Sequence, residues 1–304
     1  MMLWFKNAII YQINKDTLLD KDAVEKAVNA ALFTPCGSTD STKSGWTSPY
    51  GEAQSDDKNI MDINGQLLLR FKKEIKILPS PVIKKALAEK IAKQEDTLGR
   101  QLKKSEKLSL KDEVLIDLLP RAFSKYQFYW LWIDTKNKRI IIDSSSFKQA
   151  EDMLALLRKE LGSLALTPFS TEKPLEQIMT SWVIEKQPIT SLSLGSEIEL
   201  KDSAEESCVV RCKNQEVTSD EILVHINAGK LVNKLQLIDE NGSSYLLNKD
   251  CTLKGIKFDS EILEQNEDFM AEEYDKKLEA DFLIMNHALS DIIDRLIGNL
   301  TLSH

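Results

Sequence analysis

The chain has little of what most catalytic centres need. Its 304 residues include three histidines and four cysteines, and the cysteines are scattered: Cys36, Cys208, Cys212 and Cys251. No Cys/His spacing matches a zinc site, and no GxxxxGK[ST], GxGxxG or GxSxG motif is present. We therefore expect no catalytic residue, no metal and no cofactor.

Long apolar runs are also missing. No stretch approaches the roughly 20 apolar residues of a membrane-spanning helix. Lys6 and Asn7 interrupt the apolar N-terminus and no small-residue cleavage site follows it, so we do not expect a signal peptide. In a strand, Cys208 and Cys212 would lie roughly 13 Å apart, too far to form a disulfide with each other. A reducing, cytoplasmic compartment fits this cysteine usage best.

Acidic residues outnumber basic ones, but not everywhere along the chain. The whole sequence carries 40 Lys and Arg against 48 Asp and Glu. Residues 70–125 alone hold 15 basic against 8 acidic residues, which leaves 25 against 40 for the remainder. Such a block of like charge is usually a solvated surface, but a basic helix in an acidic protein is also a candidate site for a polyanion.

This basic segment predicts two helices. Ser80 followed by Pro81 is a typical helix start, with the hydroxyl as the cap and proline at the first helical position. We expect one helix over residues 81–108, about 40 Å long, with Gly99 as its weak point. A second, short helix is expected to begin near Ser109.

The first of these helices is predicted to be apolar on one side and cationic on the other. The apolar side chains at helical spacing are Ile83, Leu87, Ile91, Leu98 and Leu102. The cationic side chains are Lys85, Lys90, Lys93, Arg100, Lys103, Lys104, Lys107 and Lys111, with Lys84 just off their face. Lysines neutralise phosphates without recognising base edges, so the expected ligand is nucleic acid, bound regardless of sequence and sensitive to salt. The alternative is a surface whose lysines only confer solubility.

The segments that flank the basic block predict an α+β fold with a mixed β-sheet in its central region. We expect strands at 3–13, 66–71, 127–133 and 138–143, and helices at 22–32 and 147–161. Strand, helix and a Thr-Pro turn occur in this order twice, so one interpretation is an internal duplication on either side of an inserted basic helical arm.

Residues 176–257 predict short strands and one helix. That helix opens at Thr218 and closes at Gly229, and the Asn241-Gly242 pair predicts a hairpin turn after it. The acidic residues between 261 and 273 leave two alternatives, a metal site or a solvated helix entrance, and the second fits the pattern better.

The tail over residues 269–300 is the clearest helix of the sequence. Its apolar residues recur at steps of three and four: Tyr274, Leu278, Phe282, Met285, Leu289, Ile292 and Leu296. We expect this long C-terminal helix to pack in the core, with the apolar face of the basic helix as its partner. An inter-subunit coiled coil is the alternative.

These elements suggest three units. Residues 1–75 and 126–175 would form a central β-rich domain, and residues 176–268 a smaller α/β tip domain. Residues 76–125 together with 269–304 would form a helical base domain.

Several stretches resemble the bacterial recombination-associated protein RdgC family. They are LWFKN (3–7), FTPCGS (33–38) with Gly45-Trp46 beyond it, KILPSPVIKKAL (76–87), LKDEVLIDLLPRAFS (110–124), WIDT (132–135), LALLRKELGSL (154–164), QNED (265–268) and ADF (280–282). They follow the order of the family across the whole chain. Residues 190–206 match least well.

The resemblance implies a non-enzymatic DNA-binding protein that forms a ring-shaped homodimer. Duplex DNA would pass through a basic central hole with little sequence preference, and single-stranded DNA is a further candidate ligand. By occupying DNA, such a protein would restrain the RecA recombinase, which places it on the nucleoid in the cytoplasm. The match puts Lys73, Lys76, Lys84 and Lys85 near the DNA-facing side, and Arg121 and Phe123 at a subunit contact.

Two other classes of function stay open. A protein-binding scaffold would use the tail helix to recruit a partner and the basic face to dock an acidic protein, and it would have no affinity for naked DNA. A nuclease would need its scattered carboxylates to hold a metal, and no metal-ligand cluster is apparent in the sequence.

Overall fold

The computed structural model describes residues 3–14, 19–51, 58–188, 191–202, 208–264 and 274–302. Part of the acidic run noted above (Glu267, Asp268, Glu272 and Glu273) and the QNED stretch lie outside the described residues. Within these ranges no helix is long and apolar enough to cross a lipid bilayer.

The first half of the chain forms β1 (Asn7–Ile13), α1 (Lys21–Ala30), β2 (Thr42–Thr47), β3 (Met61–Ile63), β4 (Gln66–Ile77), α2 (Ser80–Leu98), α3 (Lys104–Leu118), the 3-10 turn η1 (Leu119–Arg121), β5 (Phe123–Asp134), β6 (Arg139–Ile142) and α4 (Phe147–Leu161). The second half forms β7 (Leu166–Pro168), α5 (Leu175–Ile184), β8 (Leu192–Asp202), β9 (Val209–Lys213), α6 (Asp220–Asn227), β10 (Lys230–Asp239), β11 (Ser244–Asn248), β12 (Leu253–Lys257), α7 (Ser260–Glu264) and α8 (Tyr274–Leu302).

One antiparallel sheet runs through the molecule. Its strand order is β2-β4-β5-β6-β1-β12-β11-β10-β8-β9, with β3 beside β4 and β7 beside β1. All the named strand pairs of the described residues are antiparallel, so the α+β class is confirmed but the expected mixed sheet is wrong. The reason is connectivity, because β4 and β5 are the two strands of one long hairpin and β10, β11 and β12 follow one another as a meander.

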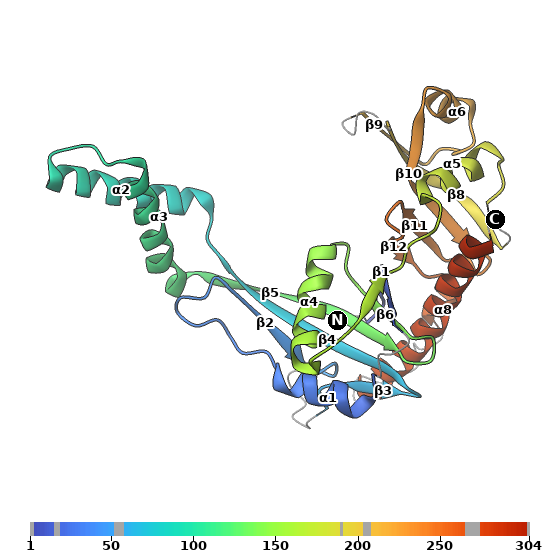
Figure 1. Ribbon diagram of the computed structural model, residues 1–304, viewed down its shortest axis with the longest axis horizontal. Helices are drawn as coiled ribbons and strands as arrows, with labels where there is room; N and C mark the ends of the chain where they lie inside the picture. The colour runs from blue at the N-terminus through green and yellow to red at the C-terminus, as the bar shows by residue number, and fades with distance from the viewer. Residues whose placement is uncertain are drawn as a thin grey trace.

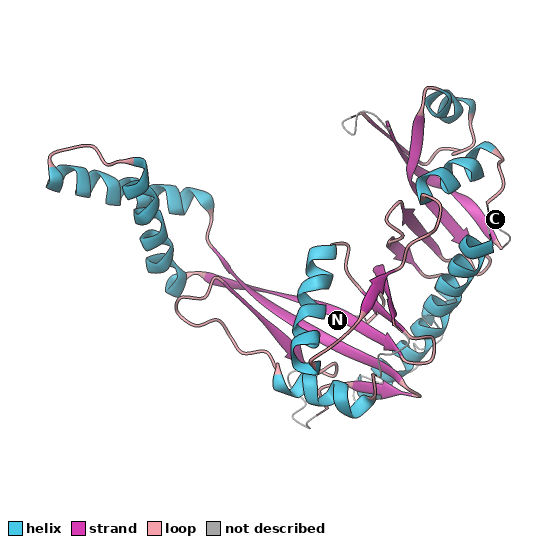
Figure 2. Cartoon of the chain, viewed as in Figure 1, coloured by secondary structure: helices cyan, strands magenta, loops and turns pink. Residues whose placement is uncertain are grey.

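The chain curves around an open concavity. The helices α2 and α3, here called the arm, project from the far ends of β4 and β5 (Figures 1 and 2). The strands β1–β7 with α1 and α4 form the body, and β8–β12 with α5 and α6 form the tip at the opposite end (Figure 1). The strand β1 joins body and tip, because Asn7 and Ala8 pair with β12 while the following residues pair with β6. The internal duplication and the domain division stay predictions.

The two faces of the body sheet carry different cores. One face is covered by α1 and α4, and its buried residues include Val24, Val28, Met153, Leu154, Phe71 and Leu131. The other face is covered by α8, whose buried residues Leu278, Phe282, Met285, Leu289, Ile292 and Leu296 continue into the core of the tip. The rings of Trp132 and Phe282 meet edge to face with centroids 6.3 Å apart.

The tail helix is therefore a core helix, as its spacing predicts, but its expected partner is wrong. It packs on the body sheet and the tip, and the arm lies at the other end of the molecule (Figure 1). Fully buried aromatic side chains such as Trp132 offer α8 a larger apolar surface than the aliphatic residues of α2, where no residue is buried.

The basic segment differs from its predicted form in three ways. It begins as strand, since β4 extends to Ile77 and pairs with β5 over its whole length. Pro79, not Ser80, occupies the cap position of α2, and no side chain caps that end. The expected helix over residues 81–108 ends instead at Leu98, because Gly99 adopts a left-handed conformation with φ of 60°. The next helix then begins at Lys104 instead of Ser109.

The strands β2, β3 and β7 and the helix α5 were not expected from the sequence. The strand β2 lies in a polar stretch, where its pairing with β4 and not its composition defines it. The helix α5 lies where only strands were expected. Its Thr180 hydroxyl accepts a hydrogen bond of 2.9 Å from the backbone N–H of Val232, which ties α5 to β10.

Candidate nucleic-acid interface

The arm is a helical hairpin held by its own ion pairs. The ammonium of Lys90 on α2 lies 3.0 Å from the carboxylates of both Glu113 and Asp117 on α3. Lys107 lies 3.2 Å from Glu95, which also accepts a hydrogen bond of 2.8 Å from the backbone N–H of Leu102. Two of the predicted DNA-binding lysines, Lys90 and Lys107, are therefore neutralised by ion pairs between the two helices.

The turn between the two arm helices is fixed by Arg100. Its guanidinium donates two hydrogen bonds, of 2.8 and 3.0 Å, to the carboxylate of Glu106. This fork, together with the backbone N–H of Lys103, lowers the pKa of Glu106 to about 2. Arg100 thus stabilises the turn that follows Gly99, and Glu106 partly neutralises its charge.

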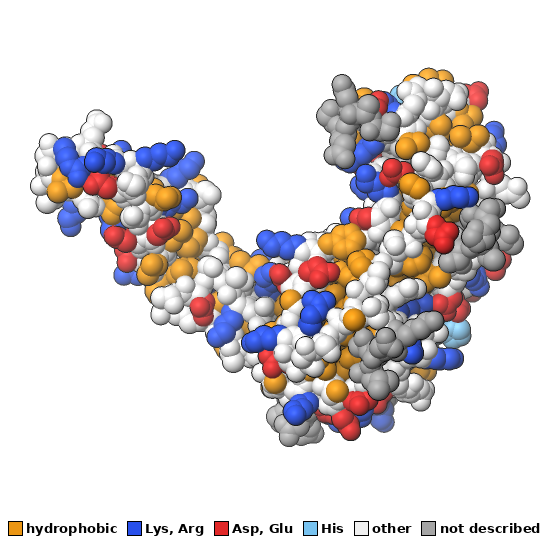
Figure 3. All heavy atoms as spheres, in the orientation of Figure 1, with side chains coloured by type: hydrophobic (Ala, Val, Ile, Leu, Met, Phe, Trp, Pro, Cys, Tyr) orange, Lys and Arg blue, Asp and Glu red, His pale blue; other side chains and the backbone are white. Residues whose placement is uncertain are grey.

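Six of the predicted arm lysines remain exposed. They are Lys84, Lys85, Lys93, Lys103, Lys104 and Lys111. Within the part of the chain that the structure describes, their side-chain ammonium groups have no hydrogen-bond or ion-pair partner. Lys and Arg side chains gather on the arm in Figure 3, including its side toward the concavity. These six lysines are the cations that a polyanion could reach.

Lys73 and Lys76 lie on the body sheet and not on the arm. The Lys73 ammonium lies 3.2 Å from the amide oxygen of Gln149 and 3.4 Å from the carboxylate of Asp152, both on α4. Lys76 lies 3.7 Å from Glu74. Lys73 and Lys76 are three residues apart in β4, so their side chains point to opposite faces of the sheet. The structure does not bring these two lysines together with the six arm lysines.

A buried carboxylate fastens the root of the arm. Glu74 is 3% exposed and accepts hydrogen bonds from the Ser124 hydroxyl and, at 2.8 Å, from the backbone N–H of Cys36. These donors, Ser124 foremost, lower the pKa of Glu74 against the opposing effect of its burial. The FTPCGS loop is thereby tied to β4 and β5 where they enter the arm.

Sequence reasoning missed a set of cations that stack on aromatic rings. Lys72 lies 4.6 Å from the ring centres of both Phe33 and Tyr126, and Arg70 lies 4.3 Å from that of Phe128. The alternating cations of β4 and aromatics of β5 are the only signal for this in the sequence. It becomes readable only once the register of the two strands is known.

A second cationic surface, on the tip, was also missed. The sheet face opposite the tip core carries Arg211, Lys213, Lys234 and Lys254 around Glu197 and Glu199, in a hollow of about 250 Å³. Figure 3 shows Lys and Arg on the side of the tip that borders the concavity. The sequence shows a few cations in this region but not that they share one face.

Glu199 organises this tip surface. It is 5% exposed and accepts hydrogen bonds from Arg211 (2.7 Å), Asn233 (2.7 Å) and Lys234 (2.8 Å). Burial alone would raise the pKa of Glu199, but these donors hold that pKa at about 2. Arg211 and Lys234 are therefore largely compensated, and the tip surface is less available to an anion than the arm.

The predicted subunit contact is exposed and apolar. Phe123 is 85% exposed, and its cross-strand partner Ile77 is 46% exposed. Arg121 at the end of η1 is also exposed, whereas Tyr126 lies three residues further along β5 and points to the opposite face of the sheet. A phenyl ring this open to water is costly in a monomer and gains by being covered.

No metal centre emerges from the residues that the structure describes. Among them, no group of three or more His, Cys, Asp and Glu side chains is placed to hold an ion. The four cysteines are free thiols.

The fold and this surface define an α+β protein with one long antiparallel sheet, a projecting basic helical arm and a concave side. A family model described as "Putative exonuclease, RdgC" matches residues 3–302, and the chain belongs to the RdgC family. The recombination-associated protein RdgC of Yersinia enterocolitica is 48% identical over 296 residues, which cover 97% of each chain. Those of Yersinia pestis and Yersinia pseudotuberculosis are 47% identical over the same length. The resemblance identified from the sequence is confirmed.

Proposed function

We propose that this protein is a non-enzymatic DNA-binding protein that holds duplex DNA without sequence preference. The observation that carries the proposal is the group of exposed arm lysines Lys84, Lys85, Lys93, Lys103, Lys104 and Lys111. Flexible ammonium groups neutralise phosphates as point charges and carry no information about bases. Single-stranded DNA offers the same phosphates and is a second ligand in this proposal.

The charge of the remaining chain supports a confined binding surface. The protein has a formal net charge of −8, although the segment around the arm is basic. An acidic exterior repels a polyanion, so DNA would be held at the arm and along the concave side. By occupying DNA on the nucleoid, the protein would restrain RecA-dependent recombination, in keeping with the name of its relatives.

We further propose that the protein works as a ring-shaped homodimer. Two curved protomers that meet at both ends would enclose a hole, and the exposed patch of Ile77, Arg121 and Phe123 suits one of the two contacts. A two-fold contact uses the same patch on both copies, so one apolar patch is sufficient for that contact.

The first test is a salt series with an unrelated-sequence duplex, with DNA integrity followed in the same samples. If the six arm lysines each neutralise a phosphate, the affinity should fall roughly 10³-fold between 50 and 200 mM salt. We expect the DNA to stay intact with and without added Mg²⁺ or Mn²⁺. Metal-dependent cleavage would support the exonuclease description of the family instead. Absence of binding at low salt would contradict the proposal.

A second prediction concerns the subunit contact. Phe123→Asp should weaken dimerisation with little loss of stability, because the ring is exposed within one chain and a carboxylate is costly to bury in an apolar interface. Sedimentation velocity would report the mass. Val224→Asp is the matched control, since Val224 is 64% exposed on α6 of the tip. A Phe123→Asp protein whose dimer dissociates at the same concentration as the unchanged protein would exclude this contact.

The protein-binding scaffold remains a second candidate because the arm also exposes apolar residues. Leu108 is 61% and Ile116 is 53% exposed. The scaffold predicts no affinity for naked DNA and retention of an acidic protein by the basic face, so the salt series separates it from the DNA-binding proposal.

A further inference from the structure

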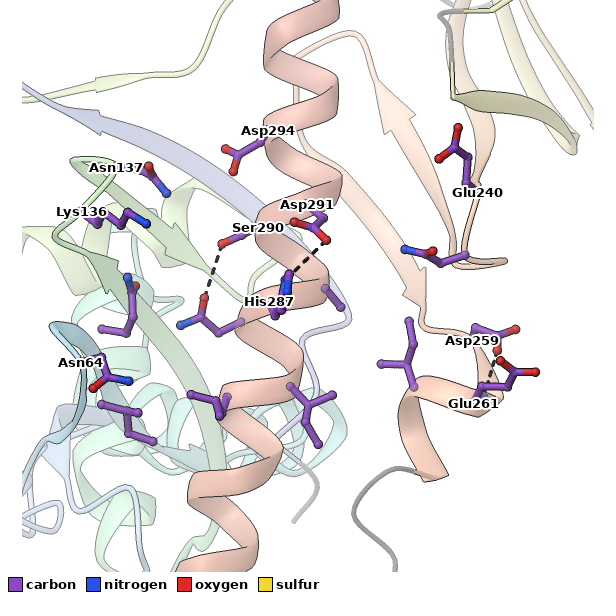
Figure 4. A pocket seen from close by; sticks show the side chains of 18 of the residues that line it. Asn64, Lys136, Asn137, Glu240, Asp259, Glu261, His287, Ser290, Asp291 and Asp294 are labelled. Carbon is purple, nitrogen blue, oxygen red and sulfur yellow. Dashed lines mark hydrogen bonds and ion pairs between the residues drawn. The ribbon is translucent and has the colours of Figure 1, made fainter.

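A large groove lies beside α8, on the outer side of the molecule, away from the concavity. Its volume is about 1320 Å³. Figure 4 shows α8 between two walls: the turns that carry Asn64 and Lys136 on one side, and the segments that carry Glu240, Asp259 and Glu261 on the other. The groove is far wider than a single side chain requires and the proposed DNA surface does not use it.

The floor of the groove is apolar and incompletely covered. Leu283 of α8 is 49% exposed, and Ile63, Ile262, Ile284 and Ala288 line the same space. An aliphatic side chain half open to water at the bottom of a groove gains free energy when another apolar group covers it.

The rim of the groove is acidic. The carboxylates of Glu240, Asp259, Glu261, Asp291 and Asp294 line it, against one lining cation, Lys136. The charges of two of these carboxylates are neutralised by arginines, because Asp294 pairs with Arg139 and Glu240 lies 3.4 Å from Arg295.

Three rim carboxylates keep their charge available. Asp259 and Glu261 have no Lys or Arg partner among the residues that the structure describes, and the partner of Asp291 is the exposed imidazole of His287 at 3.4 Å. Asp259 and Glu261 come from the entry to α7 and Asp291 from α8, so only the fold brings them to one opening. Like charges gathered in this way repel one another, and a cationic ligand relieves that repulsion.

We propose that this groove docks a basic amphipathic helix of a second protein. The apolar side of such a helix would cover Leu283 and Ile262, while its Lys and Arg side chains would meet Asp259, Glu261 and Asp291. The exposed stripe of α8 has helical spacing, since Leu283, His287 and Asp291 are four residues apart, and a parallel or antiparallel helix fits along such a stripe. The acidic rim excludes DNA, so partner and DNA would occupy separate sides of the protein.

The probe for this site is a fluorescein-labelled peptide of about five helical turns, with leucines on one face and lysines on the other. The full-length protein is titrated into it and the anisotropy is followed. A peptide of the same composition, reordered so that leucines surround the helix, serves as the ligand control. The amphipathic peptide should bind and the reordered peptide should bind at least 10-fold more weakly.

Two matched protein variants locate the binding. Glu261→Gln with Asp291→Asn removes two rim charges, and Glu172→Gln with Glu185→Gln removes two exposed charges outside the groove. The groove variant should bind the peptide at least 10-fold more weakly, the control variant should bind it like the unchanged protein, and both variants should bind duplex DNA alike. Leu283→Ala should lower the affinity for the peptide without changing how that affinity depends on salt.

Three results would overturn the proposal. Equal weakening by both double variants would show that the peptide adheres to the acidic surface in general. Equal affinity of the two peptides would show that no amphipathic ligand is recognised. Loss of self-association by the groove variant in sedimentation would make the groove an interface between copies of this chain.

Discussion

Replacement of Lys103, Lys104 and Lys111 by glutamate is expected to weaken duplex binding by roughly 100-fold and to lower the salt slope by about three. These lysines are exposed at the start and on the outside of α3 and have no ion-pair partner in the described ranges. The variant should stay folded, because none of the three ammonium groups makes a hydrogen bond or ion pair in the described arm, and only the charge of Lys103 acts on Glu106 nearby. The measurement is fluorescence anisotropy with a labelled duplex across a salt series.

The structure decides which lysine to leave unchanged in that test. Lys107 belongs to the same predicted cationic face, but its ammonium pairs with Glu95 at 3.2 Å. A Lys107→Glu change would set two carboxylates against each other and loosen the arm hairpin, so lost binding would have two explanations. Lys111 has no such partner, so its reversal tests the loss of positive charge without disturbing an ion pair of the arm.

The matched control reverses Lys26, Lys136 and Lys138, which are exposed on α1 and on the β5–β6 turn. The net charge changes equally, so long-range repulsion of DNA is the same in both variants. If the control loses as much affinity as the arm variant, the net charge and not the arm governs binding. Undiminished binding by a folded arm variant would remove these three lysines from the interface.

The second large effect concerns stability. Arg139→Ala is expected to lower the free energy of unfolding by about 3–5 kcal/mol, because it leaves a buried carboxylate without its cation. The Arg139 side chain is 4% exposed and that of Asp134 is 1% exposed, and their atoms lie 2.9 Å apart. The guanidinium also binds Asp294 and the hydroxyl of Ser290 on α8, so it joins the β5–β6 hairpin to the tail helix.

The control for this prediction is Asp294→Ala. Asp294 makes an ion pair with the same arginine but its side chain is 55% exposed, so its loss should cost less than about 1 kcal/mol. Urea unfolding at neutral pH, followed by circular dichroism, gives both values. Burial alone would raise the pKa of Asp134, but hydrogen bonds from Asn137 and Gln66 and the charge of Arg139 hold it below its usual range. Its contribution is therefore complete at neutral pH and is lost only as the pH falls through that lowered pKa. Equal losses in the two variants would show that the buried pair is not the one that matters.

The helices with a strong apolar repeat could be predicted almost to the residue. The helix at 147–161 was expected with the bounds that α4 has, and the seam from Leu278 to Leu296 of α8 is buried as its spacing predicts. In these helices the apolar side chains recur every three or four residues, so local sequence defines the buried face.

The candidate site could be predicted only in part. The excess of positive charge in residues 70–125 can be read directly from the sequence, and Lys84, Lys85 and Lys104 are exposed on the arm. The sequence gives no sign that Lys90 and Arg100 are engaged by arm carboxylates, because those contacts depend on where α2 ends and how α3 folds back. A single glycine with a positive φ at residue 99 decides both.

The sequence by itself determined the properties that are local or additive: the family, the helical repeats, the segregation of charge and the lack of a recognisable catalytic motif. The tertiary structure alone decided which charges remain available, which strand joins body and tip, and that Arg139 meets Asp294, 155 positions further along the chain. The physical reason is that pairing and burial depend on strand register and on packing between distant segments. Neither is encoded in any short window of residues.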